Sequence, residues 1–355
     1  MNAAVLYGKE DLRLEQVLLP VPGPGEIVVQ VGAALTCGTD LKVYRRGYHA
    51  RMLQPPMPFG HELAGTICAV GEGVTKFRLG DRVVPLNSAP CDRCYFCHKN
   101  QQNLCDDLLF NNGAYAEYLL VPRRIVEKNT LIIPPELPFE FAALTEPLAC
   151  VIHGLHESGA CAGETIIVIG AGPIGLMFIH SAALTGANVI AVVKHEHQAE
   201  IARRLGANKT LCILGLHGEQ EIVDATRALT PASRGADIVV EAVATPATWE
   251  WAVGMVRKGG LVNFFGGPPS GTLVALDTNR LHYGDITLKA SFHHTPASTR
   301  TAFDLIGSGR FQSAEFVTGR ASLCTIPELF RGLLTQSETN GRRDVKTAIV
   351  TGAVQ

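Results

Sequence analysis

Short apolar runs rich in β-branched residues alternate with helix-compatible stretches between residues 151 and 290. The first two runs are TIIVIG at 165–170 and NVIAVV at 188–193. Four further runs follow in LGANKTLCI, GADIVVEAV, GGLVNFFG and DITLKASF. Continuous apolar runs of this length are typical of strands that are buried on both faces of a parallel sheet. The pattern therefore predicts repeated βα units and a doubly wound α/β sheet.

The stretch from residue 166 to residue 193 is apolar enough to raise the question of a membrane span. However, four glycines, a proline and a histidine interrupt it, and its apolar runs are short. Two buried parallel strands joined by a helix explain this stretch better than a lipid-spanning helix does.

The pattern before residue 150 is different. Short alternating strands such as GEIVVQVGAAL, ELAGTICAVG and DRVVPL are joined by Gly and Pro turns, which predicts a compact, mostly antiparallel β domain. After residue 291 the chain has two helix-like stretches and a closing strand, KTAIVTG. A length of 355 residues suits two domains, and we place the boundaries at 1–150, 151–290 and 291–355.

The charge and the scattered cysteines limit the possible partners and compartments. A net charge of −2 provides no general basic field, so we expect neither a nucleic-acid partner nor an anionic membrane surface. The N-terminal segment is charged and strand-like, which does not resemble a targeting peptide. Six cysteines without short-range partners are typical of reduced thiols, so we expect a cytoplasmic protein.

Four cysteines are spaced two, two and seven residues apart in the segment APCDRCYFCHKNQQNLC, within a lobe at 88–107. Such spacing lets one loop place four thiolates around a single tetrahedral ion, and Zn²⁺ is the ion that a closed site of four sulfurs selects. Disulfides and ordinary buried cysteines are the alternatives. We predict a structural zinc site formed by Cys91, Cys94, Cys97 and Cys105.

The turn after the first predicted parallel strand has the G-x-G-x-x-G spacing of a dinucleotide-binding turn. The first glycine makes the tight turn, the second lets a pyrophosphate approach the backbone, and the third lets the helix pack closely on the strand. Because this turn lies inside a βαβ unit, we expect it to bind a nicotinamide dinucleotide. The turn consists of Gly170, Gly172, Pro173, Ile174 and Gly175, with Ala171 between the first two glycines.

The ribose of the cofactor should lie at the end of the second strand, where an acidic residue marks NAD. Val193 stands there and Lys194 follows it, with no carboxylate. A lysine can pair with the 2′-phosphate of NADP, although a solvated lysine at a strand end is the alternative. The sequence favours NADP and leaves NAD possible.

The chain resembles the zinc-dependent medium-chain dehydrogenases/reductases of the alcohol dehydrogenase superfamily, in the branch that holds sorbitol, other polyol and threonine dehydrogenases. The similarity runs almost from end to end. Besides the four-cysteine lobe, it rests on CGTD at 37–40, GHE at 60–62, VGEGVTKFRLGDRV at 70–83, GAYAEY at 113–118, TEPLACVIHG at 145–154 and GAGPIG at 170–175. The resemblance implies a GroES-like catalytic domain, to which the C-terminal segment 291–355 returns, beside a Rossmann domain.

The same segments contain residues that suit a catalytic zinc. Cys37, His61 and a carboxylate from Glu62 or Glu146 offer three ligands and leave a fourth position for water or substrate. The resemblance implies that Glu146 lies at the metal and that Glu62 binds it directly or through water, and the choice between them stays open.

Thr39 can both accept and donate a proton, so we assign it as the first proton acceptor in the reaction. The resemblance gives Asp40 a supporting role without contact to zinc. At position 42, where the family commonly has a histidine, this chain has a lysine, for which a surface position on a helix is the alternative to a role in proton transfer. These residues predict catalysis by Cys37, Thr39, His61, Glu62 and Glu146.

Together the motifs predict an oxidoreductase that transfers a hydride between a secondary alcohol or polyol, or its ketone, and NAD(P). The predicted complement is two Zn²⁺ per chain, a small-molecule substrate and a homo-oligomer, with a tetramer favoured over a dimer. Two alternatives are a catalytically weak NAD(P)-binding sensor and a zinc-free quinone or enone reductase on the same fold. The sequence does not identify the substrate.

Overall fold

The computed structural model describes residues 1–49, 51–339 and 344–351, and the chain divides into two compact units. We call Met1–Ala149 together with the segment from Thr295 onward the β-rich unit, and Cys150–His294 the parallel-sheet unit.

The β-rich unit is built on a seven-stranded sheet in which β10, β6, β5, β3, β18 and β17 follow one another and β9 also pairs with β3. Most of its strand pairs are antiparallel, whereas β17 and β18 are parallel. A three-stranded sheet, β2-β1-β4, and the short pair β7-β8 complete its strands. Its elements are β1 (Asn2–Gly8), β2 (Asp11–Gln16), β3 (Ile27–Leu35), α1 (Gly38–Arg46), β4 (Met57–Pro58), β5 (Leu63–Val70), β6 (Arg82–Pro85), β7 (Ser88–Ala89), α2 (Tyr95–His98), β8 (Leu109–Phe110), β9 (Tyr118–Val121), α3 (Arg123–Lys128), β10 (Thr130–Ile132), α4 (Phe139–Ala142), the start of α5 (Thr145–Glu157), α11 (Pro296–Gly307), β17 (Val317–Ser322), α12 (Ile326–Thr339) and β18 (Lys346–Val350).

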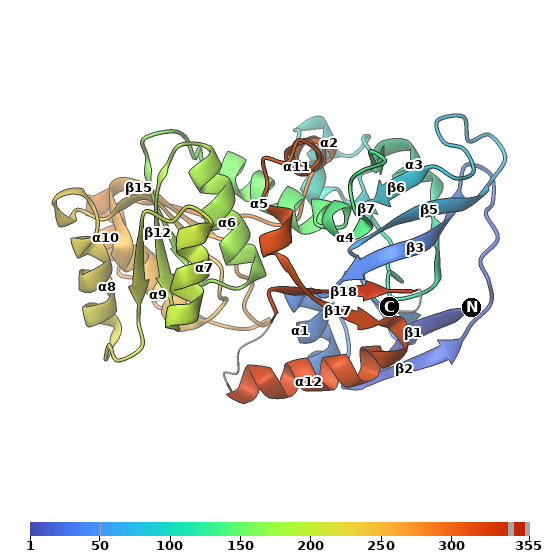
Figure 1. The fold of residues 1–355 in the computed structure, drawn as a ribbon. Helices are drawn as coiled ribbons and strands as arrows, with labels where there is room; N and C mark the ends of the chain where they lie inside the picture. The colour runs from blue at the N-terminus through green and yellow to red at the C-terminus, as the bar shows by residue number, and fades with distance from the viewer. Residues whose placement is uncertain (50, 340–343, 352–355) are drawn as a thin grey trace. The chain divides into compact units, whose positions relative to one another are not determined.

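Strand β18 joins the two ends of the chain. It pairs with β3 in an antiparallel register that places Ala348 opposite Leu35 and Val350 opposite Ala33. In Figure 1 the red β18 therefore lies in the same sheet as the blue β3. This pairing carries residues from the end of the sequence to the start of α1, where the candidate metal ligands lie.

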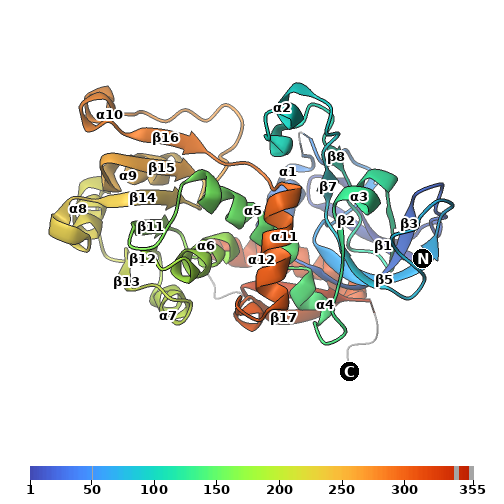
Figure 2. The same ribbon diagram turned by 90° about the horizontal axis from the view of Figure 1, so that it is seen from above.

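The parallel-sheet unit contains six parallel strands in the order β13-β12-β11-β14-β15-β16, which Figure 2 shows. Numbered within the unit this order is 3-2-1-4-5-6, the order of a doubly wound dinucleotide-binding fold. The apolar runs of the sequence form these strands, as predicted. The elements are β11 (Thr165–Ile169), α6 (Pro173–Leu184), β12 (Asn188–Val193), α7 (Glu196–Arg204), β13 (Lys209–Cys212), α8 (Glu219–Ala228), β14 (Ala236–Glu241), α9 (Pro246–Met255), β15 (Val256–Phe264), α10 (Thr278–Gly284) and β16 (Thr287–Ala290).

The order in which strands are added to this sheet reverses between β13 and β14. The chain first steps outward from β11 to β12 and β13, and then crosses to β14 on the other side of β11. Because parallel crossovers are right-handed, helices before and after this reversal cover opposite faces. Accordingly, α6 contacts α7, and α8 contacts α9. The strands added before and after the reversal, β12 and β14, flank β11 on its two sides. The turn that follows β11 is therefore at the switch point of the sheet, where a dinucleotide is expected to bind.

Candidate functional site

Three of the predicted metal ligands come together in the β-rich unit. The ligand atoms of Cys37, His61 and Glu62 all lie within 4.8 Å of one another. Cys37 follows β3, and the other two residues immediately precede β5, which pairs with β3 along most of its length. Antiparallel pairing of these two strands therefore brings together residues that are more than twenty positions apart in the sequence.

Cys37 is the N-cap of α1, and its Sγ accepts a hydrogen bond from the Thr39 amide at 3.4 Å. Its sulfur therefore lies at the N-terminal, positive end of the dipole of α1. Thr39 is half-buried in the first turn of α1, whereas Lys42 lies on the exposed side of the same helix. The predicted proton acceptor is thus beside the cysteine, and the lysine points away from the buried face.

Asp40 fixes the orientation of the His61 ring. Asp40 Oδ1 lies 2.9 Å from His61 Nδ1, and the Tyr115 hydroxyl donates to Asp40 Oδ2 at 2.6 Å. All three side chains are buried. Burial works against a charged imidazole, yet Asp40 and Cys37 raise the pKa of His61 well above its ordinary value. With Nδ1 directed at Asp40, Nε2 is the nitrogen that can bind a metal, and metal binding would displace its proton.

Tyr115 was not identified from the sequence as a functional residue. Its hydroxyl also lies 3.0 Å from the carbonyl oxygen of Leu35, at the end of β3. Gly60 makes room for the ring, because a Cβ at Gly60 would lie 2.8 Å from Tyr115 ring atoms. The glycine has a φ of 89°, which a residue with a side chain rarely adopts. The motifs GHE and GAYAEY therefore act as one packed unit behind His61.

A buried lysine holds Glu62. Lys346 Nζ lies 2.9 Å from Glu62 Oε1 and 2.8 Å from Oε2, and it donates to the Thr36 carbonyl at 2.8 Å. The lysine is 2% exposed and the glutamate is fully buried. Burial raises the pKa of Glu62 and would lower that of Lys346, but their attraction opposes both effects and raises the pKa of Lys346. With both carboxylate oxygens within 2.9 Å of the ammonium, we treat the pair as ionised. No motif in the sequence pointed to Lys346.

Glu146 lies in the first turn of α5 and is 7% exposed. Burial raises its pKa to about 7, and the charges of His61 and Glu62 act on it in opposite directions. This electrostatic influence puts Glu146 near the three clustered ligands without making it a member of the group whose atoms lie within 4.8 Å.

The four cysteines of the predicted lobe also come together. Their sulfur atoms lie within 4.8 Å of one another, with 3.6 Å between Cys94 and Cys97 and 3.8 Å between Cys94 and Cys105. Four sulfurs that are each 2.3 Å from one tetrahedral zinc are about 3.8 Å apart, whereas bonded sulfurs are about 2.0 Å apart. The arrangement fits a zinc site and excludes a disulfide between these pairs.

The protonation of the lobe thiols is uneven. A hydrogen bond from the Arg93 backbone is the largest effect that lowers the pKa of Cys91 to about 6. Burial raises the pKa of Cys105 to about 12 and also raises the pKa of Cys97. Zinc can bind all four sulfurs only when the protons of the buried pair leave.

The glycine turn between β11 and α6 has the close contacts that the dinucleotide fingerprint requires. A Cβ at Gly175 would lie 2.1 Å from the Gly170 carbonyl oxygen, so only glycine fits there. Gly170 has a φ of 101°, and Gly172, the N-cap of α6, has open space where a side chain would be. Pro173 follows as the first helical residue, where its missing N–H costs nothing, and Ile174 is next. This open, glycine-lined approach to a helix N-terminus fits a pyrophosphate.

At the end of β12 the polarity changes abruptly. Val193 is 1% exposed and pairs with Cys212 of β13, whereas Lys194 is exposed. His195 is the N-cap of α7, and its ring stacks on that of His197 at a centroid distance of 5.5 Å. The buried valine has no polar group to offer a ribose, so Lys194 is the first side chain after the strand that can meet a cofactor phosphate.

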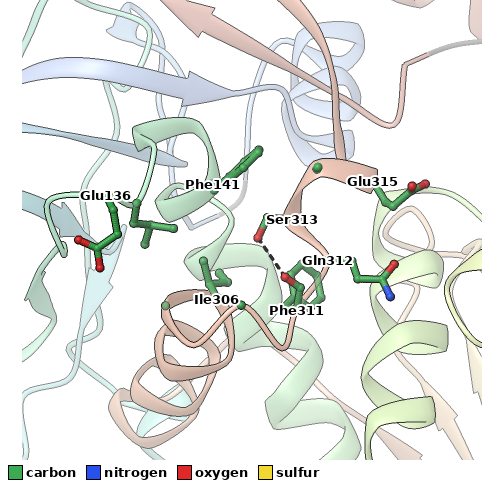
Figure 3. A pocket seen from close by; sticks show the side chains of 11 residues that line it. Glu136, Phe141, Ile306, Phe311, Gln312, Ser313 and Glu315 are labelled. Atoms are coloured by element: carbon green, nitrogen blue, oxygen red, sulfur yellow. Dashed lines mark hydrogen bonds between the residues drawn. The ribbon is translucent and has the colours of Figure 1, made fainter.

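A cavity of about 500 Å³ in the β-rich unit lacks a convergent set of polar or metal-binding side chains among the described residues that line it. It lies between the segment before α4 and the turn after α11, and Phe141, Ile306 and Phe311 supply much of its lining. Figure 3 shows the Glu136 and Glu315 carboxylates at opposite ends of it. Since these two acidic groups do not converge, we do not assign this cavity a catalytic role.

No helix in the described parts of the chain is both long enough and apolar enough to cross a lipid bilayer. This finding agrees with the interpretation of residues 166–193 as two strands and a helix.

Comparison with known proteins places these sites in a family. Residues 23–132 match the alcohol dehydrogenase GroES-like domain, and residues 173–308 match the zinc-binding dehydrogenase family. Sorbitol dehydrogenase from Bacillus subtilis (strain 168) is 31% identical over 330 residues, which cover 91% of this chain and 90% of the relative. L-Threonine 3-dehydrogenase from Thermococcus kodakarensis is 31% identical over 330 residues, covering 90% and 89%.

Among solved structures, one from Sinorhizobium meliloti 1021, described as a zinc-binding dehydrogenase bound to NADP, has a TM-score of 0.87 and 28% identity. The match covers 98% of each chain. The resemblance that the sequence motifs indicated is therefore confirmed, as is the fold of a GroES-like domain and a Rossmann domain. The chain belongs to the zinc-binding, alcohol dehydrogenase family of NAD(P)-dependent oxidoreductases.

Proposed function

We propose that the protein oxidises a secondary alcohol, drawn from the polyols or hydroxy amino acids, with NADP as the preferred hydride acceptor, and catalyses the reverse reduction. The observation that carries the proposal is the buried cluster of Cys37, His61 and Glu62, in which Asp40 orients the histidine. The substrate classes come from the relatives, a sorbitol dehydrogenase and a threonine dehydrogenase.

The donor set of this cluster fits a catalytic zinc. One thiolate, one imidazole and one carboxylate are three ligands of the kinds that catalytic zinc sites use, and they leave a position for substrate. We assign Cys37, His61 and Glu62 as the ligands within the cluster and Glu146 as the further carboxylate at the site. Zinc held there would supply Lewis acidity toward an alcohol or carbonyl oxygen.

The protein groups around the cluster each have a defined task. Asp40 keeps the Nδ1 side of His61 engaged, so that Nε2 stays directed at the metal position. Lys346 neutralises Glu62 and limits how far that carboxylate can turn toward the metal position. The Thr39 hydroxyl, two residues after Cys37, accepts the proton of the substrate alcohol and passes it toward solvent.

The cofactor and metal proposals rest on separate observations. NADP is favoured because Lys194 is exposed at the end of β12, where a carboxylate would mark NAD, and because one solved neighbour is described with NADP bound. A complement of two zinc ions per chain is supported by the two ligand groups whose residues all lie in the β-rich unit, the four lobe cysteines and the cluster of Cys37, His61 and Glu62. We retain a cytoplasmic homo-oligomer, with a tetramer favoured, as part of the proposal.

Turnover and metal content test the proposal together. Reduced-nicotinamide absorbance would be followed with NAD and NADP over a panel of polyols, secondary alcohols and threonine, alongside zinc content per chain. Cys37→Ser should lose turnover and one zinc and keep the lobe zinc. Cys161→Ser, an exposed cysteine outside both ligand groups, is the matched control and should change neither. Full turnover in Cys37→Ser would contradict the assignment of the catalytic zinc.

A further inference from the structure

A second cleft, of about 990 Å³, lies entirely within the parallel-sheet unit. It is formed by helix α8, the start of β15 and helix α10, elements that Figure 2 places on the same side of this unit. Residues 256–258 begin β15, so the cleft lies at the amino ends of the parallel strands. The glycine turn follows the carboxyl end of β11, and the cleft is therefore at the opposite end of the sheet from the cofactor turn.

The lining of the cleft is strongly basic. It contains a single carboxylate, that of Asp224, which is engaged by the Gln220 amide at 2.9 Å. The basic residues that line the cleft are Arg227, Arg234, Arg257, Lys258 and Arg280. The surplus of positive charge in one concave surface contrasts with the chain as a whole, whose net charge is −2.

Two of the guanidinium groups converge on one carbonyl at the end of α9. Arg227 Nη1 lies 3.3 Å from the oxygens of both Gly254 and Val256, and Arg280 Nη2 also donates to Gly254. The partial negative charge at the C-terminus of a helix favours a nearby cation, so capping of α9 accounts for one of these two arginines. The second arginine adds a like charge beside the first. Burial is the largest cause that lowers the pKa of Arg280, and the positive charge of Arg227 lowers it further. An anion between the two guanidinium groups would relieve this repulsion.

Other donors in the cleft have no protein acceptor. Arg280 Nε is buried and has no hydrogen-bond partner in the described part of the chain. Arg234 and Lys258 are exposed, and neither forms an ion pair with any described residue. Arg257 differs, because its Nε is paired with Asp237 at 2.5 Å. The cleft therefore contains buried and exposed cationic donors, and the five basic residues of its lining outnumber the three acidic groups that act on Arg280, namely Asp277, Asp224 and Glu219.

We propose that this cleft binds a small organic phosphate that carries at least two phosphate groups. Planar guanidinium groups match phosphate oxygens in pairs, and two inner arginines with two outer cations suit phosphates placed one after the other. The volume is at the upper end of the range for small-molecule sites. Tyr283, 73% exposed and part of the lining, offers a ring face to the organic part of the ligand.

Calorimetry with inorganic pyrophosphate tests this site. The zinc-loaded protein would first receive one equivalent of NADPH per chain, which occupies the glycine turn; excess NADPH is avoided because its own phosphates would compete for the cleft. We expect one pyrophosphate per chain, binding that weakens steeply with added salt, and weaker binding of orthophosphate. Absence of pyrophosphate binding under these conditions would overturn the proposal, and equal affinity for orthophosphate would overturn the requirement for two phosphates.

Paired variants separate a built site from general charge. Arg234→Gln with Lys258→Gln should weaken pyrophosphate binding at least tenfold and leave NADPH affinity unchanged, because both residues are exposed and unpaired with described residues. Arg300→Gln with Arg310→Gln removes the same charge from exposed positions of the β-rich unit and is the matched control. Equal weakening in both double variants would show a nonspecific charge effect and refute the site.

Discussion

Replacing Lys346 by Met should destabilise the β-rich unit specifically. The ammonium has three acceptor atoms within 2.9 Å, two of them on Glu62, and both side chains are buried. Met fills a similar volume but leaves a buried carboxylate without its counter-charge. Removing one partner of a buried ion pair costs about 3–5 kcal/mol, much more than the loss of an exposed pair.

Urea unfolding can localise this loss, because the two tryptophans of the chain, Trp249 and Trp251, both lie in α9 of the parallel-sheet unit. Tryptophan fluorescence therefore reports that unit, and circular dichroism reports both. With an m-value of about 2–3 kcal/mol per molar, the circular dichroism transition of the β-rich unit should move down by about 1–2.5 M urea. The fluorescence transition should move much less.

The double variant Lys346→Met with Glu62→Gln provides the control. It removes the uncompensated charge, so it should recover a large part of the stability that Lys346→Met loses, and the non-additivity measures the coupling of the pair. A shift below about 0.3 M in Lys346→Met would refute the reasoning. The reasoning would also be refuted if the double variant lost more unfolding free energy than the two single variants lose together.

Three further predictions concern the cofactor and the lobe. Lys194→Ala should weaken NADP binding about tenfold or more, as measured by fluorescence titration, and barely change NAD binding; equal losses would place the lysine in solvent. Gly175→Ala should abolish binding of both dinucleotides in the same titration, because its Cβ would meet the Gly170 oxygen at 2.1 Å, and retained affinity would contradict the geometry. Zinc binding to the lobe must displace protons from Cys97 and Cys105, whose pKa values burial raises, so affinity should increase about a hundredfold per pH unit near pH 7 in chelator competition; a slope below one proton would contradict this.

The sequence alone determined those parts of the protein whose physics is local. The four lobe cysteines span only 15 residues, so their spacing could be recognised as one metal site. Likewise, the glycine turn lies between a strand and the helix that follows it. The close approach that it requires joins Gly175 to Gly170, which are only five positions apart in the sequence. Buried parallel strands were visible because each is a short apolar run.

The tertiary structure decided how the candidate metal cluster is supported. Lys346 and Glu62 are 284 residues apart, and Tyr115 and Asp40 are 75 apart. No local pattern predicts such pairs, because a lone lysine or tyrosine has the same sequence signal on the surface as in a buried network. Pairing of β18 with β3 brings the lysine to the glutamate, and a buried charge is tolerated only where that pairing supplies its partner. The basic cleft arises in the same way, from arginines on separate elements that only the folded sheet brings together.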